Sequence, residues 1–520
     1  MERRVVETWR QAGVEAAAGT QAALAAYGRL LAIPELELPA RLRLAALHLG
    51  EGGVREATAE ALAASALPES DPYLLLALAR QLMELGEIEA GLHCLGRTPL
   101  VECNDAELLL QSGALLCNFS FYEPALDRLE RARASGLAGG QIWYQLGLAR
   151  MYCGRTDAAA EAFEACLRMA PDFAPAARLL STLRRQTPAS NHLARLRASL
   201  TRLGDAHAFA PLLHYALFKE LDDIGEVAAA WPHLEQGMRL RRAQLHYDEA
   251  AEAALFEALH RLPLHRLQVP AGTGPTGPVP VFILGMPRSG STLLERFLCA
   301  HPDVSDAGEL RDFSCQLRWI TGVAGGPHPD VALVQAAASC DLALLGRRYM
   351  EHVAWRSSGK PFLIDKLPSN FLLAGVIAAA LPHARIVDIG RAPLDSCFSN
   401  LKALFADAYP HSYHQGEMAR HYLRYRRLMA HLDKEFPGRV LHVSYEALVA
   451  DPEAQVRSVL EFCGLPWCEE VMQPDRKGVI GTASTVQLRE PVHSRFLGQW
   501  RRYERYLQPL RDQLGAAVTE

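Results

Sequence analysis

A glycine-rich turn between an apolar run and an amphipathic run is the part of this sequence best suited to chemistry. It reads FILGMPRSGSTLLERF over residues 282–297. The backbone N–H groups of such a turn, with a helix N-terminus behind them, favour an anionic group. Gly285 and Gly290 let the backbone approach phosphate oxygens. Ser291 and Thr292 add hydroxyl donors, so the turn is predicted to bind a phosphate or a similar anion.

The turn differs from that of an ATP-using enzyme at one position. In such an enzyme a lysine bridges the outer phosphates, and the Ser or Thr after it holds Mg²⁺. Here Ser291 stands in the lysine position, and Arg288, three residues earlier, can offer a charged fork to the anion. The turn suits a nucleotide whose transferred group needs no metal. A degenerate ATP site and a plain strand-to-helix turn are the two alternatives that these residues leave open.

A second anion-binding pattern follows a later apolar run. ARIVDIGRAPLDSCFSN, residues 384–400, places Arg391 directly after a predicted strand and Ser399 eight residues further on. Ligands of open α/β sheets bind beyond the carboxyl ends of the strands, where Arg391 should lie. Arg391 and Ser399 would hold a second phosphate, unless Arg391 only forms an ion pair with Asp395. Two anion sites at two strand ends predict a nucleotide with two separate phosphate groups.

Short β-branched runs alternate with helical patterns in the second half of the chain. The predicted strands are VPVFILG (279–285), PFLIDK (361–366), ARIVDIG (384–390) and RVLHVS (439–444). An amphipathic stretch follows each run, which is typical of parallel βαβ units with helices on both faces of a sheet. One helix is well delimited, because Asp451 can cap it, Pro452 can open it and Gly464 follows its last residues.

The first half of the chain is rich in Ala and Leu and repeats itself every 34 residues. Four columns keep this interval: Ala79, Gly113 and Gly147; Gly86, Ser120 and Gly154; Gly91, Ala125 and Ala159; Leu95, Leu129 and Phe163. Small residues recur where paired helices approach closely, and large apolar residues recur where the next helix packs. The pattern predicts stacked helix-turn-helix units, with a fainter unit over 217–237 and a degenerate or capping unit before about residue 70.

The clearest copy of the repeat, GQIWYQLGLARMYCGRTDAAAEAFEACLRMAP, resembles the tetratricopeptide repeat, with Trp143 and Phe163 in the expected places. A Pro- and Gly-rich segment, VPAGTGPTGPVP, comes later and cannot hold a helix. We therefore predict an all-α tetratricopeptide-repeat domain over 1–262, a linker over 263–280 and an α/β domain over 281–520.

The segment PRSGSTLLERFLCAHPDVSDAGEL resembles the start of PAPS-dependent sulfotransferases. It is most similar to the tyrosylprotein sulfotransferases and to bacterial sulfotransferases that carry tetratricopeptide repeats, and the resemblance covers roughly residues 279–510. It implies a P-loop-like α/β fold with a central parallel sheet. It also implies transfer of a sulfonate group from PAPS (3′-phosphoadenosine 5′-phosphosulfate), as co-substrate, to a hydroxyl acceptor, without a metal.

The resemblance implies which residues bind the donor. The 5′-phosphosulfate would contact the turn through Arg288, Ser289, Gly290, Ser291 and Thr292. Arg391 and Ser399 would hold the 3′-phosphate. Tyr445 would lie against the nucleotide, although a core tyrosine is the plain alternative. The segment IGTASTVQLREPV resembles a late loop that closes over the donor, with Ser484 as a catalytic and Arg489 as a cofactor-binding residue; Thr485 leaves the register there open.

Sulfuryl transfer needs a base for the acceptor and positive charge for the oxygens that develop negative charge. The resemblance places the base on Glu309 in DAGELRD and the stabilising cation on Lys366 at the end of the second predicted strand. The alternatives are that Glu309 only favours a helix N-terminus and that Lys366 is a solvated surface lysine. Asp306 and Asp312 are further candidates for the base.

The overall composition limits the compartment and the partners. The chain has 520 residues, 49% of them hydrophobic, and a formal net charge of −5, which argues against general nucleic-acid binding. Its start shows no signal peptide, and no apolar run approaches the ~20 residues of a membrane span. The eleven cysteines form no CxxC pair, which predicts a reducing compartment and no metal site. We therefore expect a cytoplasmic protein without membrane contact.

The sequence leaves the acceptor open. A tyrosyl peptide or protein, a glycan, a lipid and a small hydroxyl compound are all compatible with the donor site. The repeats would either bind a protein partner or mediate homodimerisation. Two other functions stay in competition: an ATP-dependent, kinase-like phosphotransferase, against which Ser291 is the strongest feature, and a repeat scaffold with a vestigial nucleotide domain.

Overall fold

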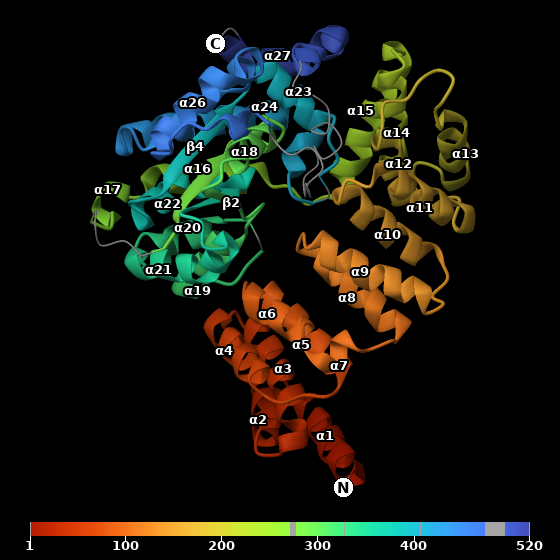
Figure 1. Cartoon of the computed structure of the whole chain (residues 1–520), viewed down its shortest axis with the longest axis vertical. Helices are drawn as coiled ribbons and strands as arrows, with labels where there is room; N and C mark the ends of the chain where they lie inside the picture. Colours follow the sequence, from red (N-terminus) through yellow and green to blue (C-terminus); the bar gives the residue numbers. More distant parts are fainter. Residues whose placement is uncertain (1, 271–276, 327, 406, 474–493, 519–520) are drawn as a thin grey trace.

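The protein consists of a helical array followed by an α/β half (Figure 1). A computed structural model describes residues 2–270, 277–326, 328–405, 407–473 and 494–518. The helices of the first half are α1 (Glu2–Ala16), α2 (Thr20–Leu30), α3 (Pro34–Gly50), α4 (Val54–Ser65), α5 (Pro72–Glu84), α6 (Ile88–Leu95), α7 (Thr98–Val101), α8 (Ala106–Asn118), α9 (Tyr122–Ala134), α10 (Gly140–Tyr152), α11 (Thr156–Met169), α12 (Ala174–Thr182), α13 (Leu193–Leu203), α14 (Ala210–Asp223), α15 (Val227–Gln244), α16 (Glu249–Arg261) and α17 (Leu264–Leu267).

The 34-residue columns correspond to definite positions in the paired helices. Gly86, Ser120 and Gly154 each follow the first helix of a pair, and all three have positive φ, 89°, 66° and 80°. A Cβ on Gly147 would lie 2.5 Å from Cε1 of Phe163, so the small and large columns meet where two helices cross. The fainter unit is a helix pair too, with Gly225 at φ 89° between α14 and α15. The predicted paired-helix array is confirmed.

Among the described residues, the second half contains one parallel sheet in the order β2-β3-β1-β4-β5. The strands are β1 (Val279–Leu284), β2 (Val304–Asp306), β3 (Phe362–Lys366), β4 (Arg385–Gly390) and β5 (Val440–Ser444). The helices are α18 (Ser291–Cys299), α19 (Asp312–Thr321), α20 (Val331–Ala337), α21 (Leu342–Val353), α22 (Ala374–Ala380), α23 (Pro393–Leu401), α24 (Gln415–Glu435), α25 (Tyr445–Ala450), α26 (Pro452–Cys463) and α27 (Gln508–Leu514). The four predicted strands are present and parallel, as expected. The sequence did not indicate β2, which has only three residues.

The sheet is buried on both faces because successive side chains of a strand point to opposite sides. Val281 and Ile283 of β1 pack with α18 and α26, whereas Phe282 and Leu284 belong to the core on the other face. The helix α26 has the predicted limits. The Asp451 carboxylate accepts the N–H of the third helical residue, and a left-handed glycine ends the helix. These two cores fix the carboxyl edge of the sheet, where the glycine-rich turn begins.

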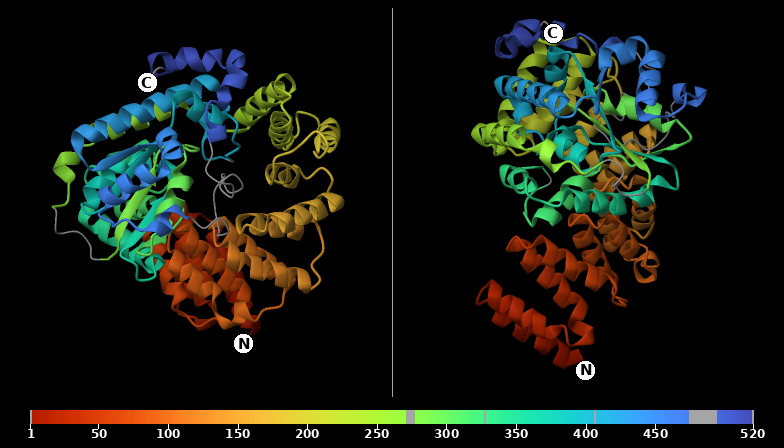
Figure 2. Two further views of the ribbon diagram at one scale, coloured as in Figure 1. Left: turned by 45° about the horizontal axis from the view of Figure 1, so that its top comes forward. Right: turned by 90° about the vertical axis from the view of Figure 1, so that its left-hand side faces the viewer.

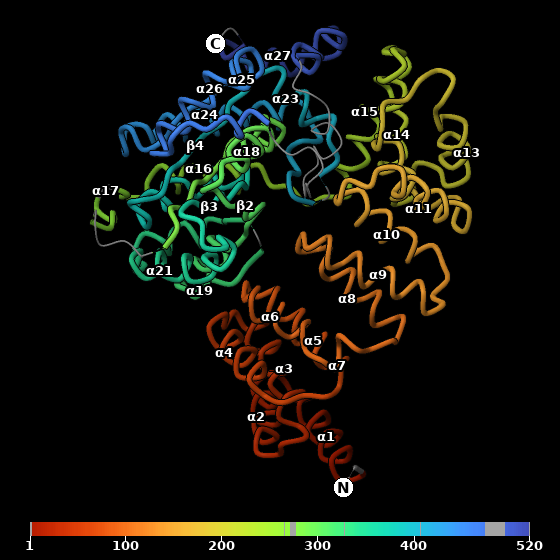
Figure 3. Tube along the Cα trace, in the orientation of Figure 1, coloured from red at the N-terminus to blue at the C-terminus, as the bar shows by residue number. Residues whose placement is uncertain are grey.

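The helical array curves around the α/β half (Figures 2 and 3) and contacts it at several places, among them an early and a late one along the chain. The early contact joins α4 to α19, where the Arg55 guanidinium donates to the carbonyl oxygens of Trp319 and Ile320. The late contact joins α14 to α23, where the Tyr215 hydroxyl donates to the Leu401 carbonyl over 3.1 Å. No helix in the described part of the chain is long and apolar enough to cross a membrane.

The boundary between the halves is less sharp than the composition suggests. Helix α16, which lies inside the range predicted as repeat domain, packs on α20 and α24 of the α/β half. Its Glu249 forms ion pairs with Arg420 and Arg424 of α24. The limits predicted at 262 and 280 stay predictions, and these contacts show that α16 packs against the α/β half.

Candidate active site

The glycine-rich turn links β1 to α18 at the centre of the sheet. Gly285 has φ 137° and Gly290 has φ 102°, so both adopt backbone conformations that favour glycine. Arg288 also has positive φ, 66°, which an arginine adopts only when its surroundings hold it there. Ser289 is fully buried, and within the described residues its hydroxyl has no hydrogen-bond partner. A strained turn with an enclosed, unsatisfied hydroxyl fits the predicted anion site.

The two glycines are also required by close neighbours. A Cβ on Gly285 would lie 2.5 Å from the Ile389 carbonyl oxygen, and a Cβ on Gly290 would lie 2.3 Å from Cδ2 of Tyr445. Tyr445 is buried at the start of α25, directly after β5. The structure therefore places this tyrosine against the turn, and its contact with a nucleotide stays a prediction.

Ser291 and Thr292 begin α18, and both are buried behind the turn. Gly290 occupies the position before the helix in a left-handed conformation. Four backbone N–H groups at the start of any α-helix lack partners within that helix, and they attract an anion. The predicted order of strand, turn and helix is confirmed by the geometry.

Arg391 lies at the carboxyl end of β4 and joins this strand end to the turn. Its Nη1 donates to the Arg288 carbonyl oxygen over 3.3 Å, and its Nη2 is 3.3 Å from Oδ1 of Asp395. Its Cζ lies 4.8 Å from the centroid of the Tyr445 ring. The ion pair with Asp395 is therefore present, but it engages only Nη2 of the Arg391 guanidinium. The buried Nε of Arg391 has no partner among the described residues.

Ser399, which is predicted to hold a phosphate together with Arg391, lies on the helix that follows it. Ser399 is half-buried on α23, and no hydrogen bond connects the two residues in the described part of the chain. The neighbouring Asn400 is fully buried and donates through Nδ2 to the Pro287 carbonyl oxygen over 2.8 Å. Asn400 thus attaches α23 to the turn, and it was not identified from the sequence.

Positive charge accumulates around the turn. Burial, together with the charge of Arg391, lowers the pKa of Arg288 to about 10. Burial likewise lowers the pKa of Lys402 to about 8; Asp222 opposes the shift, and Arg391 and Arg288 add to it. Lys402 Nζ donates to Oε1 of Gln499 over 2.6 Å. Cations that repel one another in a partly buried space are the expected surroundings of a polyanion. Lys402 was not identified from the sequence, although it directly follows α23.

The two predicted catalytic side chains meet. Lys366 Nζ at the end of β3 lies 2.5 Å from Glu309 Oε1 and 3.7 Å from Glu295 Oε2. Lys366 is fully buried, so it is not the solvated surface lysine of the alternative. Burial by itself would lower the pKa of Lys366, but Glu295 and Glu309 outweigh this effect and raise it. Lys366 therefore stays charged at neutral pH, with Glu309 as its closest counter-ion.

Glu295 is a member of this group that sequence reasoning did not find. It is buried on α18, and burial raises its pKa well above the usual range in spite of the nearby Lys366. The signal in the sequence was a glutamate between Leu294 and Phe297 on the apolar side of a helix. Its Oε2 lies 3.7 Å from Lys366 Nζ, so Glu295 contacts the lysine from the interior side, whereas Glu309 contacts it from the more exposed side.

The other candidates for the base occupy different positions. Asp306 is exposed, and its carboxylate accepts the Gly308 N–H over 2.8 Å. Asp312 is buried at the start of α19, and burial raises its pKa. Neither side chain contacts Lys366 as Glu309 does, so the geometry favours Glu309. Ser484 and Arg489 lie outside the described residues.

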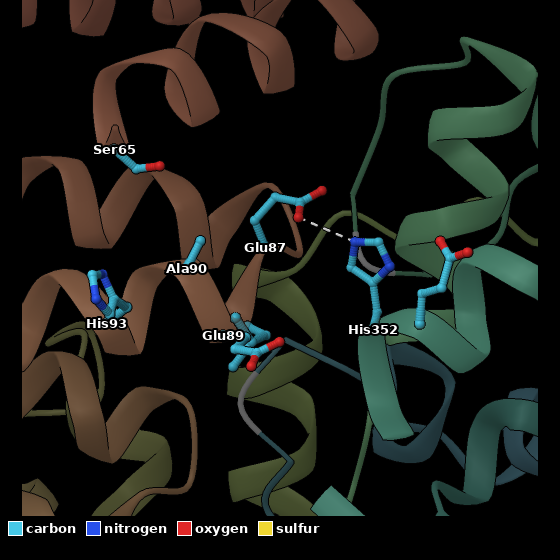
Figure 4. A pocket seen from close by; sticks show the side chains of 8 residues that line it. Ser65, Glu87, Glu89, Ala90, His93 and His352 are labelled. Atoms are coloured by element: carbon cyan, nitrogen blue, oxygen red, sulfur yellow. Dashed lines mark hydrogen bonds and ion pairs between the residues drawn. The ribbon is translucent and has the colours of Figure 1, made fainter. Parts of the chain in front are cut away.

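Two further groups of polar residues lie away from the turn. A surface pocket between α6 and α21, where Glu87 Oε2 is 3.1 Å from His352 Nε2, is shown in Figure 4. It is lined by Ser65, Glu87, Ile88, Glu89, Ala90, His93, Glu351 and His352.

Glu252, His411 and His421 bring possible metal ligands within 4.8 Å of one another. Arg424 already pairs with Glu252 over 2.6 Å, which disfavours a cation there.

Comparison with known proteins points in the same direction as the geometry. Residues 280–469 match the family model described as the sulfotransferase family. An uncharacterized protein of Aquifex aeolicus (strain VF5) is 35% identical over 314 residues, which is 57% of this chain and 40% of that protein. Protein-tyrosine sulfotransferase 1 of Danio rerio is 27% identical over 235 residues, which is 42% of this chain and 65% of that protein.

The chain thus spans less than two thirds of the length of either relative. Among solved structures, the sulfotransferase domain from the Synechococcus PCC 7002 olefin synthase is 22% identical. The match covers 45% of this chain and 90% of that one, with a TM-score of 0.32, which is too low to add support. The residues that match the family model include the turn and the two strand ends described above. Residues 280–469 form a sulfotransferase family domain, and an N-terminal helical region precedes it.

Proposed function

We propose that this protein transfers a sulfonate group from PAPS to a hydroxyl acceptor, and that the tyrosine of a peptide or protein is the first acceptor class to test. The observation that carries the proposal is that the ends of β1 and β4 meet in one site, with an arginine following each strand. Arg391, which follows β4, donates to the backbone of Arg288 in the turn after β1. The donor has phosphate groups at both ends of its ribose, and two separate cationic positions match that distribution of charge.

The residues of the site fit this donor. The unsatisfied Ser289 hydroxyl and the unsatisfied Nε of Arg391 are both buried, and such groups are expected to have a partner when the site is filled. Ser289, Gly290, Ser291, Thr292 and Arg288 would hold the 5′-phosphosulfate. The 3′-phosphate would bind to Arg391 and Ser399, with Tyr445 beside the nucleotide. The bound donor supplies an activated sulfonate group on a phosphate leaving group.

The two catalytic side chains divide the remaining work. Glu309 would accept the proton of the acceptor hydroxyl, because one of its carboxylate oxygens is engaged by Lys366 and its side chain is 35% exposed to solvent. Lys366 would stabilise negative charge as it develops on the sulfonate and bridging oxygens, because it is buried and carries a permanent charge. Glu295 would keep Lys366 in position from the interior side. No step in this scheme asks for the lysine that Ser291 replaces.

Binding experiments separate this proposal from the ATP-using alternative. Calorimetry with adenosine 3′,5′-bisphosphate, ATP and AMP should give the tightest binding for the bisphosphate, by at least about tenfold, because only this ligand presents both phosphates at the correct ends. Equal affinity for the bisphosphate and AMP would contradict the two-phosphate site. Preferential binding of ATP would favour a phosphotransferase.

The acceptor needs a separate experiment. The Danio rerio relative is a protein-tyrosine sulfotransferase by name, and this supports a tyrosyl acceptor only as a starting point. A screen with sulfur-labelled PAPS should include tyrosyl peptides, glycans, lipids and small phenols. Transfer to tyrosyl peptides with no transfer to their phenylalanine analogues would support the proposed acceptor. Transfer only to a glycan or a small phenol would keep the sulfotransferase proposal and reject the peptide.

A further inference from the structure

One arginine of the helical array lacks the partner that a buried charge normally has. Arg178 lies on α12, is half-buried, and has an enclosed Nε without a hydrogen-bond partner in the described part of the chain. Within that part, no carboxylate forms an ion pair with it. Buried charges are usually paired, because an unpaired one loses its hydration without compensation. Arg178 is therefore not explained by the packing of the array alone.

Contacts through α14 and α23 connect the helix of Arg178 to the donor site. Helix α12 packs against α14, whose Tyr215 donates to the Leu401 carbonyl oxygen over 3.1 Å. Asn400, the residue before Leu401, donates to the carbonyl of Pro287 in the turn over 2.8 Å. Two consecutive residues of α23 thus connect the array on one side with the glycine-rich turn on the other.

Electrostatics supports the same proximity. The charge of Arg178 contributes to the lowered pKa of Arg288, after burial and the charge of Arg391. Burial lowers the pKa of Arg178 as well, and the groups that oppose this are the hydroxyls of Tyr215, Tyr413 and Tyr152, not a carboxylate. Two arginines from different halves of the protein therefore repel each other, and no carboxylate of the described residues compensates Arg178. An anion placed between them would remove the repulsion.

We propose that Arg178 belongs to the donor site, where its guanidinium binds the 5′-phosphosulfate end of the donor from the side of the helical array. The inference rests on the proposed function and adds to it, because it makes the array part of the catalytic centre rather than only a partner-binding appendage. The array holds α12 in place through the Tyr215 contact. The α/β half alone would then lack one of the cations of the donor site.

Three variants and three ligands test the proposal on the full-length chain. Arg178→Ala removes the charge, Arg178→Lys keeps it, and Arg168→Ala on the neighbouring α11 is the matched control, because Arg168 is exposed. The ligands are adenosine 5′-phosphosulfate, adenosine 3′,5′-bisphosphate and adenosine 3′-monophosphate, measured by calorimetry or by competition. The last ligand lacks the 5′ group and reports only on the Arg391 side.

The expected result is selective. Arg178→Ala should weaken binding of the two 5′-substituted ligands about tenfold to a hundredfold, as expected for a charge-assisted hydrogen bond to an anion. Its affinity for adenosine 3′-monophosphate should stay within about twofold of wild type, and Arg168→Ala should resemble wild type with all three ligands. Arg178→Lys should recover part of the loss, because it restores the charge but not the planar fork.

A stability measurement excludes a merely structural role. Without ligand, the Tm of Arg178→Ala should equal or exceed that of wild type, because the substitution removes an unpaired, half-buried charge. A lower Tm together with equal losses for all three ligands would overturn the inference, and so would wild-type affinity of Arg178→Ala for the 5′-phosphosulfate. If the wild-type protein binds none of the three ligands, the proposed function itself fails, and the inference falls with it.

Discussion

Nζ of Lys366 lies 2.5 Å from Oε1 of Glu309, so the two side chains predicted to carry the chemistry form a direct ion pair. The lysine is fully buried at the end of β3, whereas the glutamate side chain is 35% exposed. The pair therefore spans the boundary between the protein interior and the solvent. One end holds a fixed positive charge, and the other presents a carboxylate to an incoming acceptor.

The first prediction concerns the base. Glu309→Gln keeps an oxygen for the contact with Lys366 but can no longer accept a proton. Turnover with labelled PAPS and a productive acceptor should fall by about 10²–10⁴-fold, the usual contribution of general base catalysis. Affinity for adenosine 3′,5′-bisphosphate should stay within about threefold of wild type. Asp306→Asn is the control, and a larger loss of turnover in this variant would move the role of base to Asp306.

The second prediction separates Lys366 from Glu295. Lys366→Met should lower turnover by about 10²–10³-fold, because a positioned charge that stabilises the transition state is lost. Glu295→Gln should keep turnover within about tenfold of wild type. Glu295 Oε2 lies 3.7 Å from Lys366 Nζ, and the amide keeps an oxygen at this position while Glu309 remains the closer counter-ion. A loss in Glu295→Gln as large as that in Lys366→Met would mean that Glu295 takes part in the proton transfer itself.

The third prediction is an uptake of protons on ligand binding. Burial lowers the pKa of Lys402 to about 8 in the ligand-free protein, so this amine is about half protonated at pH 8. A bound polyanion favours the charged form, so its binding should take up as much as about half a proton at this pH. Calorimetry of adenosine 3′,5′-bisphosphate in buffers with different ionisation enthalpies measures this number.

The lowered pKa of Lys402 also makes the free energy of unfolding depend on pH. The pKa of Lys402 is lower in the folded than in the unfolded chain, so the unfolded chain binds more protons between about pH 8 and pH 10. The contribution of Lys402 to the free energy of unfolding therefore rises with pH in this window. Lys402→Met should abolish both the proton uptake and this contribution. Uptake that persists in the variant would assign the effect to another group.

The fourth prediction concerns the contact between Gly290 and Tyr445. In Gly290→Ala the new Cβ would lie 2.3 Å from the tyrosine ring, at a residue with φ 102°, so the ring has to move. The ring also lies beneath the Arg391 guanidinium, and affinity for adenosine 3′,5′-bisphosphate should fall at least about tenfold.

Gly464→Ala is the matched control for backbone strain. Gly464 has φ 81° and no atom within 4 Å of the position of a new Cβ. This variant should lose about 1–2 kcal/mol of stability without any loss of affinity. Normal affinity in Gly290→Ala, measured by the same titration, would show that the position of Tyr445 does not matter for the nucleotide.

The sequence predicted the local parts of the site well. The strand, the glycine-rich turn and the helix around Gly290 follow from the alternation of apolar runs and breakers, which acts over a few residues. Arg391 was placed correctly at a strand end for the same reason. The three-residue strand β2 was missed, because three residues show no periodicity. The role of Ser399 beside a second phosphate stays a prediction, and the contact of the neighbouring Asn400 with the turn was not foreseen.

The sequence by itself determined the elements: the 34-residue helix pairs, the parallel strands and a turn that favours anions. These depend on local periodicity and on backbone preferences, which the residue types set directly. Only the tertiary structure decided which charges meet. Lys366 reaches Glu309 across 57 residues, and Tyr215 reaches Leu401 across 186. Such pairings arise when buried faces dock against each other, and no spacing along the chain encodes them. The local sequence therefore sets the turns of the site, and the packing of the two halves brings its charged side chains together.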